Sequence, residues 1–568
     1  MTRFFAAVAC SCALVAVGVA GQRGTPAPAG TAEVGGTVRA DPAGTPAARV
    51  MVLIAGTDVG VLRVTATDTA GHFAFAGLPA GRFLLAAGKP AYLSALYGAG
   101  RVGRPGATIT VADGQKISDV TLALAKGAVI AGHVTDEHGQ AIVGARVRVL
   151  PRRTAGDEIV LGADAGDPVN ATSDDLGAFR IFDLVPGDYV VAVQPRGLAG
   201  GLPMTYSSVY FPASPRAADA EVIHVAGGEE RPNIDVRTAL VALSRVEGVV
   251  TGAPGPQLNV QILLRPSGQN AAGAVLNSQT TRPGPDGRFA FANVVPGSYD
   301  VVARTLPAPN PGTPPGDQPA PLWALDHIGV TDTMPPTVSL RLQPALTLTG
   351  RITFDGLSSP PEDVGNIRVG VRPTPASAVP NVPEPALMDR SGHFTLTNLT
   401  PGRYRLVVVV PPNNVTQVPD WFPKSAVVAG QDALDVPIEI GPGRDPGAVT
   451  IELTDDAPEI AGTVRDASEQ PARGATVIAF PSDSRFWFQQ SRRIAVRQTN
   501  AHGEFVFGLG AALPPGDYRL AVVSDLGPGE QFDSVLLAEL AKTAQAVTLA
   551  DGDSKTIALR LVSAARQR

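Results

Sequence analysis

Histidine, cysteine and the acidic residues are the side chains here that could do chemistry, and their spacing fits no catalytic or metal-binding pattern that we recognise. The chain has seven histidines. A zinc peptidase needs a His-x-x-Glu pair and a distant histidine, but His133 is followed three residues on by Asp136, and the others have no acid there. His502-Gly503-Glu504 has the His-x-Glu spacing of zinc deaminases, yet that chemistry also requires two cysteines. We therefore expect no zinc site and no catalytic residue.

Glycine-rich and acidic runs could bind a cofactor or another metal. Residues 98–103 match the glycine spacing of a dinucleotide-binding loop, but they lead into Arg104-Pro105 and not into the helix whose N-terminus binds the pyrophosphate. The acidic pairs 174–175 and 455–456 lack the alternating ligand spacing of a calcium loop. We expect no cofactor and no metal.

Aromatic side chains are the best candidates for ligand contact, because sugar rings stack their C–H faces on exposed aromatic rings. The candidate ligand-binding residues are Trp421, Phe422, Trp487, Trp323 and Tyr210. The alternative is that these large rings pack in a core or at its edge, and three tryptophans in the whole chain are few for a dedicated sugar-binding protein. Packing is the favoured interpretation, and polysaccharide binding stays open.

The first twenty residues predict a secretory signal peptide. Arg3 forms a short basic start, Phe4–Val19 is apolar, and Gly18 and Ala20 are small residues suited to a cleavage site. A membrane anchor is the alternative, but the apolar run is shorter than the ~20 residues of a spanning helix. We expect residues 1–20 to be removed, residues 21–31 to form a linker, and the mature chain to have no transmembrane segment.

Both cysteines, Cys10 and Cys12, lie inside this signal segment. The mature chain would then have no disulfide, no thiolate nucleophile and no cysteine zinc ligand. Residues 7–10 resemble a lipidation motif, so a lipoprotein attached through Cys10 is an alternative, although cleavage there would leave a short apolar segment. We expect an exported protein that is periplasmic, at the cell surface or extracellular.

The elements that must position any site come from an internal repeat. Three short phrases recur five times in the same order. The first is Gly-x-Val or Gly-x-Ile, and the third is Pro-Gly-x-Tyr or a close variant. The second has the form Asp-x-x-Gly-x-Phe, with Gly284 in place of the aspartate in the third copy and Asn500 in the fifth. The glycines of the second phrase are Gly71, Gly177, Gly287, Gly392 and Gly503. A repeat of this length predicts tandem copies of one domain.

Each phrase has a physical role in a β-rich fold. The Asp-x-x-Gly turn predicts an acid that hydrogen-bonds nearby backbone and a glycine with positive φ. The alternating Phe-x-Phe that follows predicts a half-buried strand. The tyrosine after Pro-Gly predicts a hydroxyl that bonds back across the corner. The best helix candidate is 533–542, with Val535, Leu536, Leu540 and Ala541 on one face.

We therefore predict an all-β chain of five tandem immunoglobulin-like or transthyretin-like sandwiches. The predicted units are 32–125 (unit 1), 126–241 (unit 2), 242–343 (unit 3), 344–456 (unit 4) and 457–565 (unit 5). The proline- and glycine-rich stretch 306–321 predicts a long loop at a domain end, where recognition residues often lie.

The three phrases, together with Gly144-Ala-Arg-Val147 and Gly474-Ala-Thr-Val477, resemble the carboxypeptidase regulatory-like domain. That family has a transthyretin-like sandwich and is grouped with Cna-B and starch-binding-domain-like folds. The resemblance implies this fold and a non-catalytic, accessory role. Cna-B domains also suggest isopeptide cross-links, but the five opening strands contain no lysine, so we expect none.

Composition and charge agree with an exported β protein. The chain has 62 glycines and 52 prolines among 568 residues, charged residues make up 17%, and the net charge is −6. Without a basic block, nucleic acid is not an expected partner. We predict a non-enzymatic spacer or adhesion-type protein-binding array that contacts an envelope protein. The alternatives are a carbohydrate-binding protein and an accessory module of a peptidase or outer-membrane transport system.

Overall fold

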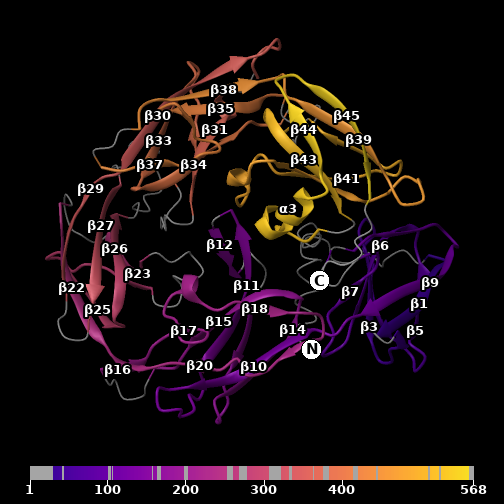
Figure 1. Ribbon diagram of the computed structural model, residues 1–568, viewed down its shortest axis with the longest axis horizontal. Coiled ribbons are helices and arrows are strands. Elements are labelled where there is room, and N and C mark those ends of the chain that lie inside the picture. The colour runs from indigo at the N-terminus through magenta and orange to yellow at the C-terminus, as the bar shows by residue number, and fades with distance from the viewer. Residues whose placement is uncertain are drawn as a thin grey trace.

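The computed structural model contains five β-sandwich units joined in one chain (Figure 1). It describes residues 30–561 except 41–43, 100–103, 105, 157, 163–167, 198–202, 253–259, 268–277, 306–320, 332–335, 362–363, 375–382, 413–419, 443–445, 509–511 and 524–525. The expected signal peptide, Cys10, and nearly all of the expected 21–31 linker and 306–321 loop lie outside the described residues. Among the described residues, no helix has the length and hydrophobicity to cross a membrane.

Each of the first two units has two main sheets. In unit 1 the first sheet contains β1 (Ala32–Ala40), β2 (Thr45–Pro46), β5 (His72–Leu78) and β9 (Lys116–Leu124), and the second contains β3 (Met51–Gly56), β4 (Leu62–Ala66), β6 (Gly81–Gly88), β7 (Ala95–Leu96) and β8 (Ile109–Val111). In unit 2 the first sheet contains β10 (Ala128–Thr135), β14 (Ala178–Leu184), β19 (Glu230–Arg231) and β20 (Val236–Arg237). Its second sheet contains β11 (Arg146–Ala155), β12 (Glu158–Leu161), β13 (Val169–Thr172), β15 (Gly187–Gln194), β17 (Val209–Tyr210) and β18 (Ile223–Val225), and β16 (Met204–Tyr206) pairs with β21 (Leu240–Ala242).

The last three units repeat this plan. In unit 3 the sheets are β22 (Ser244–Thr251), β25 (Arg288–Val294) and β28 (Thr337–Arg341), and β23 (Val260–Pro266), β24 (Gln279–Thr281), β26 (Gly297–Thr305), β27 (Leu322–Val330) and β29 (Gln343–Pro344). In unit 4 they are β30 (Leu346–Asp355), β33 (His393–Leu399), β35 (Phe422–Val428), β36 (Gln431–Asp432) and β38 (Val449–Thr454), and β31 (Arg368–Pro373), β32 (Ala386–Leu387), β34 (Gly402–Val409) and β37 (Ile438–Ile440). In unit 5 they are β39 (Glu459–Arg465), β42 (Glu504–Phe507) and β45 (Ser554–Arg560), and β40 (Thr476–Pro481), β41 (Ala495–Gln498), β43 (Gly516–Val523) and β44 (Gln545–Leu549).

Helix is scarce, as the sequence predicts. The α-helix α3 (Ser534–Ala541) begins where Asp533 accepts hydrogen bonds from two N–H groups of its first turn. Its buried face contains Leu537 and Leu540, whereas Val535 is 66% exposed; the expected helix is confirmed, but the face assigned to Val535 was wrong. Short 3₁₀ helices occupy Ala217–Asp219, Val364–Asn366, Ser484–Phe486 and Glu530–Phe532.

One strand order recurs in every unit. The opening strand pairs antiparallel with the phenylalanine-bearing strand on one side and parallel with a strand near the end of the unit on the other, as β1 does with β5 and β9. The second main strand pairs antiparallel with the strand that follows Pro-Gly, as β40 does with β43. The alternating residues of the two sheets face each other and form one core per unit.

The predicted turn chemistry is confirmed. In unit 1, Asp68 Oδ1 accepts hydrogen bonds from the N–H groups of Ala70 and His72, and Gly71 has φ +78°. The same acceptor pattern holds at Asp174, Asp389 and Asn500. The glycine keeps a positive φ at residues 177, 287, 392 and 503.

The predicted tyrosine bond is also confirmed, in four units. The Tyr189 hydroxyl donates to the carbonyl oxygen of Val185 at 2.6 Å, so the side chain ties its strand to the preceding turn. The equivalent hydroxyls of Tyr299, Tyr404 and Tyr518 donate to the carbonyls four residues earlier. In unit 1 the buried Phe83 stands at this position.

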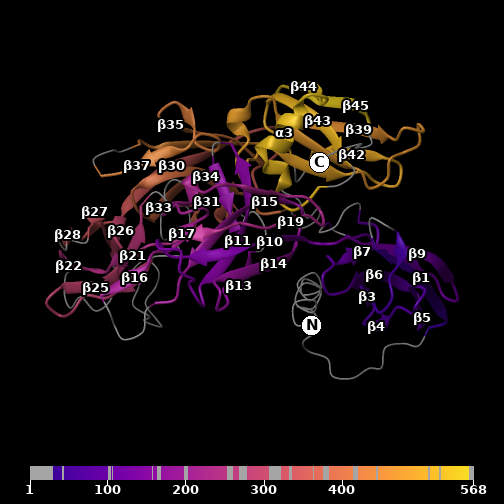
Figure 2. The same cartoon turned by 60° about the horizontal axis from the view of Figure 1, so that its bottom comes forward.

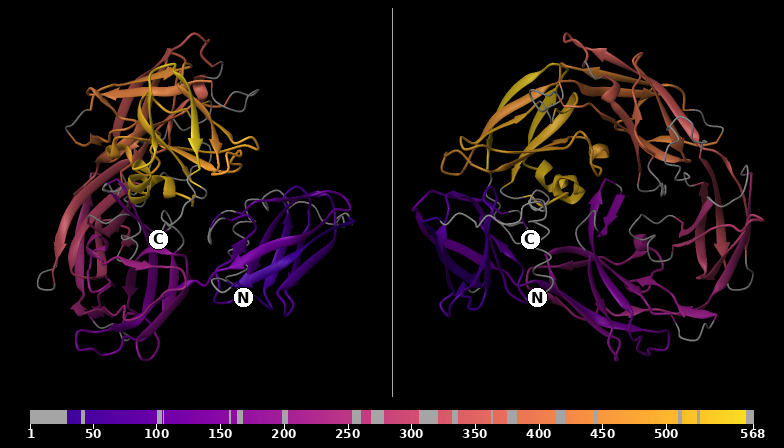
Figure 3. Two further views of the ribbon diagram at one scale, coloured as in Figure 1. Left: turned by 45° about the vertical axis from the view of Figure 1, so that its right-hand side comes forward. Right: turned by 180° about the vertical axis from the view of Figure 1, so that it is seen from behind.

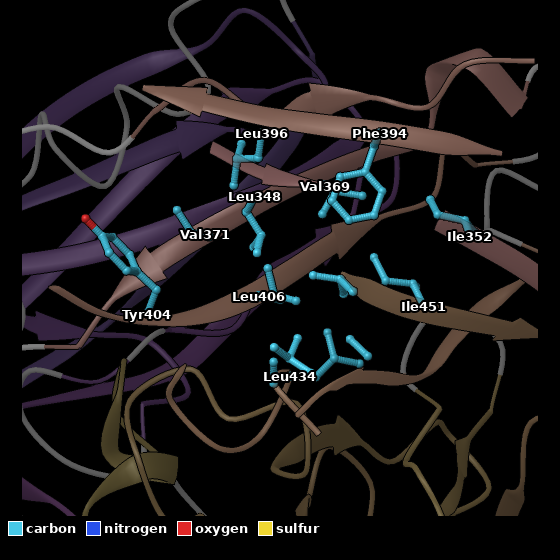
Figure 4. Close-up of a cluster of buried hydrophobic side chains, with 14 of the residues drawn as sticks. Leu348, Ile352, Val369, Val371, Phe394, Leu396, Tyr404, Leu406, Leu434 and Ile451 are labelled. Carbon is cyan, nitrogen blue, oxygen red and sulfur yellow. The ribbon is translucent and has the colours of Figure 1, made fainter. Parts of the chain in front are cut away.

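The core of unit 4 shows how the two sheets pack (Figure 4). Leu348 and Ile352 from β30 and Phe394 from β33 pack against Val369 and Leu406 of the opposite sheet. All five side chains are buried. Such clusters exist separately in each unit, so each unit has a main core of its own.

The opening glycine of each unit lies where a neighbouring strand or segment approaches too closely for a side chain. Gly350 lies opposite Phe394 in the antiparallel pair and opposite Val449 in the parallel pair. A Cβ at Gly350 would lie 2.5 Å from the Val449 carbonyl oxygen and 2.6 Å from Phe394 Cζ. No residue with a side chain fits there unless the strands separate.

The five units follow a curve, so the last unit returns to the first two. In Figure 1 the chain passes from unit 1 through units 2, 3 and 4, and α3 of unit 5 lies near β12 of unit 2. Figures 2 and 3 show unit 1 set to one side of the curve that units 2–5 form.

We predict that Gly350→Ala destabilises unit 4 by about 1–3 kcal/mol, the usual cost of overpacking a core. Hydrogen exchange measured by mass spectrometry on the full chain should show faster exchange in residues 346–454 than in the other units. The control is Gly441→Ala, because a Cβ at Gly441 meets no atom within 4 Å. Equal exchange in the two variants would contradict this account.

Candidate functional site

The structure places the five aromatic candidates mainly in packed surroundings. Trp421, Trp323, Trp487 and Tyr210 are buried, and only Phe422 is half-buried. The ring of Trp421 contacts that of Phe354 edge-on, with centroids 5.0 Å apart. Four of these rings therefore pack in buried surroundings, as the favoured interpretation expects. Sugar stacking stays a prediction, and these four rings expose little surface for it.

Polar atoms of these rings show how they are anchored. Trp323 Nε1 donates to the Pro344 carbonyl at 3.1 Å, and Trp487 Nε1 donates to the Pro481 carbonyl at 2.7 Å. Burial raises the pKa of Tyr210 to about 12. Trp487 belongs to a second, outer core of unit 5 that includes Leu537 of α3.

One cluster of serine, aspartate and histidine occurs in unit 3. Ser267 Oγ and His327 Nδ1 both lie within hydrogen-bond distance of Asp300 Oδ1, at 2.5 and 2.7 Å. Arg265 forms an ion pair with the other oxygen of Asp300 at 3.3 Å. A nucleophilic serine must donate to the histidine, but here it donates to the aspartate, so this arrangement stabilises a buried carboxylate and does not activate the serine.

A group of possible metal ligands lies in unit 2, at Asp136, Glu137 and His138. Asp136 Oδ1 already accepts hydrogen bonds from the N–H groups of His138 and Gln140, as turn aspartates do. Glu137 accepts from the N–H of Leu240. The cluster therefore has a structural role in the turn.

A cluster of two aspartates and two arginines lies at the junction of units 4 and 5. Asp435 of unit 4 has a side chain only 3% exposed. Its Oδ2 atom forms ion pairs with two arginines of unit 5, with Arg492 Nη2 at 2.9 Å and with Arg493 Nε at 2.8 Å. Arg492 also pairs with Asp432 at 2.8 Å. These contacts join the two units through buried ion pairs, which we call the 4–5 lock.

The electrostatics of the lock favour the charged forms. Burial alone disfavours the Asp435 carboxylate, but the hydrogen bonds and charges of Arg492 and Arg493 outweigh that effect and hold the pKa of this carboxyl below its usual value. At the edge of the junction, the hydrogen bond to Asp355 raises the pKa of the Lys424 ammonium. Breaking one partner of such a buried pair typically costs about 3–5 kcal/mol.

Arginine and aromatic side chains stack across the same junction. The guanidinium carbon of Arg405 in unit 4 lies 3.5 Å from the centroid of the Phe488 ring in unit 5, whereas Arg493 and Phe486, 4.9 Å apart, stack within unit 5. Phe488 of the Phe486-Trp487-Phe488 run, called the Phe-Trp-Phe run below, therefore stacks on a residue of unit 4. This stacking holds the Arg405 guanidinium in a fixed plane.

Two pockets flank the lock. One, of about 140 Å³, is lined by Arg372, Arg405 and Arg492 together with Phe488, Gln489, Gln490 and the apolar residues Leu406, Val407, Val408, Pro423 and Leu434; we call it the arginine pocket. The other, of about 120 Å³, is more apolar and includes Phe422, Lys424 and Asp551. Both lie between units, where no single unit forms the whole lining.

Unit 5 also contacts units 1 and 2. Arg104 of unit 1 forms an ion pair with Glu530 at 2.8 Å, and the N–H of Gly156 in unit 2 donates to Ser534 Oγ at 2.7 Å. Arg153 Nη1 donates to the Pro528 carbonyl. These polar contacts surround Ala155 and Val160 of the β11–β12 hairpin, which pack on Phe532. We call this set the closure contact.

Local sequence patterns did not predict the 4–5 lock. Its members are separated by about 60 residues, since Arg492 follows Asp432 and Asp435 at that distance, so no local pattern shows the pairing. The available signal was the Arg492-Arg493 doublet beside the Phe-Trp-Phe run. Neighbouring arginines and aromatics are typical of interfaces.

Comparison with known families supports the predicted resemblance for part of the chain. Residues 33–125 and 129–202 match the profile of the carboxypeptidase regulatory-like domain, so the resemblance is confirmed for units 1 and 2. No curated protein matches the sequence.

Three solved structures illustrate the structural similarity. A streptococcal ancillary pilin has TM-score 0.21 and 11% identity over 55% of this chain and 99% of its own. The minor pilin of Streptococcus agalactiae has TM-score 0.22 and 12% identity over 40% of this chain and 100% of its own. The Bacillus anthracis TIE protein has TM-score 0.15 and 10% identity over 93% of this chain and 73% of its own. The description of this chain as all-β sandwiches in tandem rests on its own sheets.

The depressed pKa of Asp435 makes the 4–5 lock sensitive to acid. Because the folded carboxyl binds its proton less readily than the unfolded one, its stabilisation is complete above the ordinary aspartate pKa of ~3.9 and is lost as pH falls through the folded value. Asp435→Asn should therefore lower the melting temperature at pH 7. Below about pH 4, the melting temperature of this variant should fall less steeply with pH than that of the wild type. Thermal unfolding followed by tryptophan fluorescence measures both.

The control for this prediction is Asp517→Asn, which changes an exposed aspartate of unit 5 outside the lock. It should leave the pH dependence of the wild type in place. If Asp435→Asn and the wild type lose stability in parallel on acidification, the lock does not depend on this carboxylate.

Proposed function

We propose that the chain is an exported, non-catalytic array of β-sandwiches that acts as a protein-binding scaffold of fixed shape, in the bacterial envelope or outside the cell. The observation that carries the proposal is that unit 5 contacts units 1, 2 and 4 through specific side chains. Contacts between units far apart in the sequence favour one arrangement of the array. A fixed arrangement presents loops from several units to a partner at constant spacing.

The closure contact distinguishes such a scaffold from an extended spacer. Five sandwiches held only by their linkers would extend along the chain, whereas these contacts bring unit 5 back to the hairpin of unit 2 (Figure 3). Glycine at position 527 accommodates this closure, because a Cβ there would lie 1.7 Å from Arg104 Nη1. Within this proposal, envelope-protein binding is favoured over a role as a simple spacer.

Small-angle X-ray scattering tests the fixed shape. The wild type should have a radius of gyration nearer the ~24 Å of a compact chain of this length than that of an open string. The double variant Arg104→Glu, Arg153→Glu places negative charge beside Glu530 and the Pro528 carbonyl, so its radius should increase. Arg146→Glu, an exposed change on β11, is the control, and an unchanged radius in the double variant would contradict the closed scaffold.

Export is tested separately. The full sequence produced in a Gram-negative host should appear outside the inner membrane, and its intact mass should match a chain that begins at Gly21. A variant that lacks residues 2–20 should stay in the cytoplasm. A mass that retains residues 1–20, or lipid on Cys10, would contradict cleavage after Ala20.

A further inference from the structure

We propose that the arginine pocket between units 4 and 5 binds a carboxylate-bearing sugar, such as a hexuronate unit of an acidic polysaccharide, with Arg372 as the residue that binds the carboxylate. This inference rests on the side chains of the pocket and is independent of the scaffold role. It assigns a ligand class to a site that no single unit could form.

The polar groups that line the pocket are the first support. Arg372, Gln489 and Gln490 are among its lining residues, and no described residue forms a hydrogen bond or ion pair with any of these three side chains. Arg372 and Gln490 are exposed and Gln489 is half-buried. The surrounding protein removes part of the water around the Arg372 guanidinium and so lowers its pKa, a desolvation that a bound carboxylate would offset. Three unpartnered polar side chains around one small pocket are therefore available to a ligand.

Positive charge is the second support. The charged residues in the lining are Arg372, Arg405 and Arg492, and no acid is among them. Arg492 is paired with Asp432 and Asp435, which compensate its charge, so the positive charge that faces a ligand comes from Arg372 and Arg405. The field of the pocket thus attracts an anion, and the planar guanidinium of Arg372 suits two parallel hydrogen bonds to a carboxylate.

The remaining walls favour a sugar acid over a simple inorganic ion. Val407 and Pro423, both half-buried, provide apolar surface against which the C–H groups of a ring can pack. The two glutamine amides can both donate to and accept from hydroxyl groups. The volume of about 140 Å³ is well below the ~300–1,000 Å³ of drug-sized sites. It suits one sugar unit of a chain that continues into solvent.

Backbone conformation at the rim is an independent observation. Gln490 has φ +60°, in the left-handed region that residues with a Cβ rarely adopt. This strained residue is one of the residues that line the pocket. Strain of this kind often accompanies binding sites, and here it sets the position of one of the unpartnered amides.

Binding to the full chain, measured by isothermal titration calorimetry and ligand-observed NMR, tests the proposal with sodium glucuronate, glucose and sodium sulfate as probes. Glucuronate should bind in the millimolar range or tighter, glucose should not, and sulfate should bind more weakly. Arg372→Ala should weaken glucuronate binding at least about tenfold, as expected for loss of a charge-assisted pair. Arg372→Lys keeps the charge but loses the planar guanidinium, so its affinity for glucuronate should lie between those of the wild type and Arg372→Ala.

The matched control is Arg368→Ala, because Arg368 is an exposed arginine on the same strand, β31, that does not line the pocket. It should bind like the wild type. Unchanged tryptophan fluorescence in Arg372→Ala would show that the fold is intact. Equal affinity for sulfate and glucuronate would overturn the sugar assignment, and no glucuronate binding, or equal loss in the Arg368 and Arg372 variants, would overturn the site.

Discussion

In each unit the opening strand pairs in parallel with a strand near the end of the unit, and the architecture depends on this constraint. A chain that enters along one strand and leaves along a parallel neighbour enters at one end of the sandwich and exits at the other. Successive units can therefore follow one another end to end. The pairing is close: a Cβ at the opening glycine would lie 1.9 to 2.6 Å from a carbonyl oxygen of the segment beside it, at Gly36, Gly132, Gly248, Gly350 and Gly462.

End-to-end linkage alone would permit many arrangements of the five units, and side-chain contacts select one. The 4–5 lock uses buried charge, where geometry matters and a lost partner is costly. In the closure contact, Phe532 of unit 5 packs against the β11–β12 hairpin of unit 2, and Glu530 forms an ion pair with Arg104 of unit 1. The two kinds of contact act together, because unit 5 reaches unit 2 only if its orientation to unit 4 is also held.

Local sequence patterns predicted what depends on neighbours in the sequence. The acid–backbone bonds of Asp68, the positive φ of Gly71 and the tyrosine bond of Tyr189 all involve residues within four positions. The burial of Trp421 and Trp487 was harder to predict, because it depends on strands and loops that are distant in the sequence. Trp487 is covered by α3, about fifty residues later in the chain. The partners of Arg492 lie in another unit, so no local periodicity contains them.

The way side chains pack within and between units explains why the candidate site lies at a junction. Inside each unit the two sheets fill the space with interlocking side chains such as Phe394 and Leu406 (Figure 4), so the core offers a ligand no room. A junction is different, because two surfaces that pack through a few fixed ion pairs leave gaps beside them. At the 4–5 junction the lock uses Arg492 and Arg493 for stability and leaves Arg372 at the edge of the gap. A tandem array can thus gain a binding site without altering the repeated sandwich, by changing residues only where two copies meet.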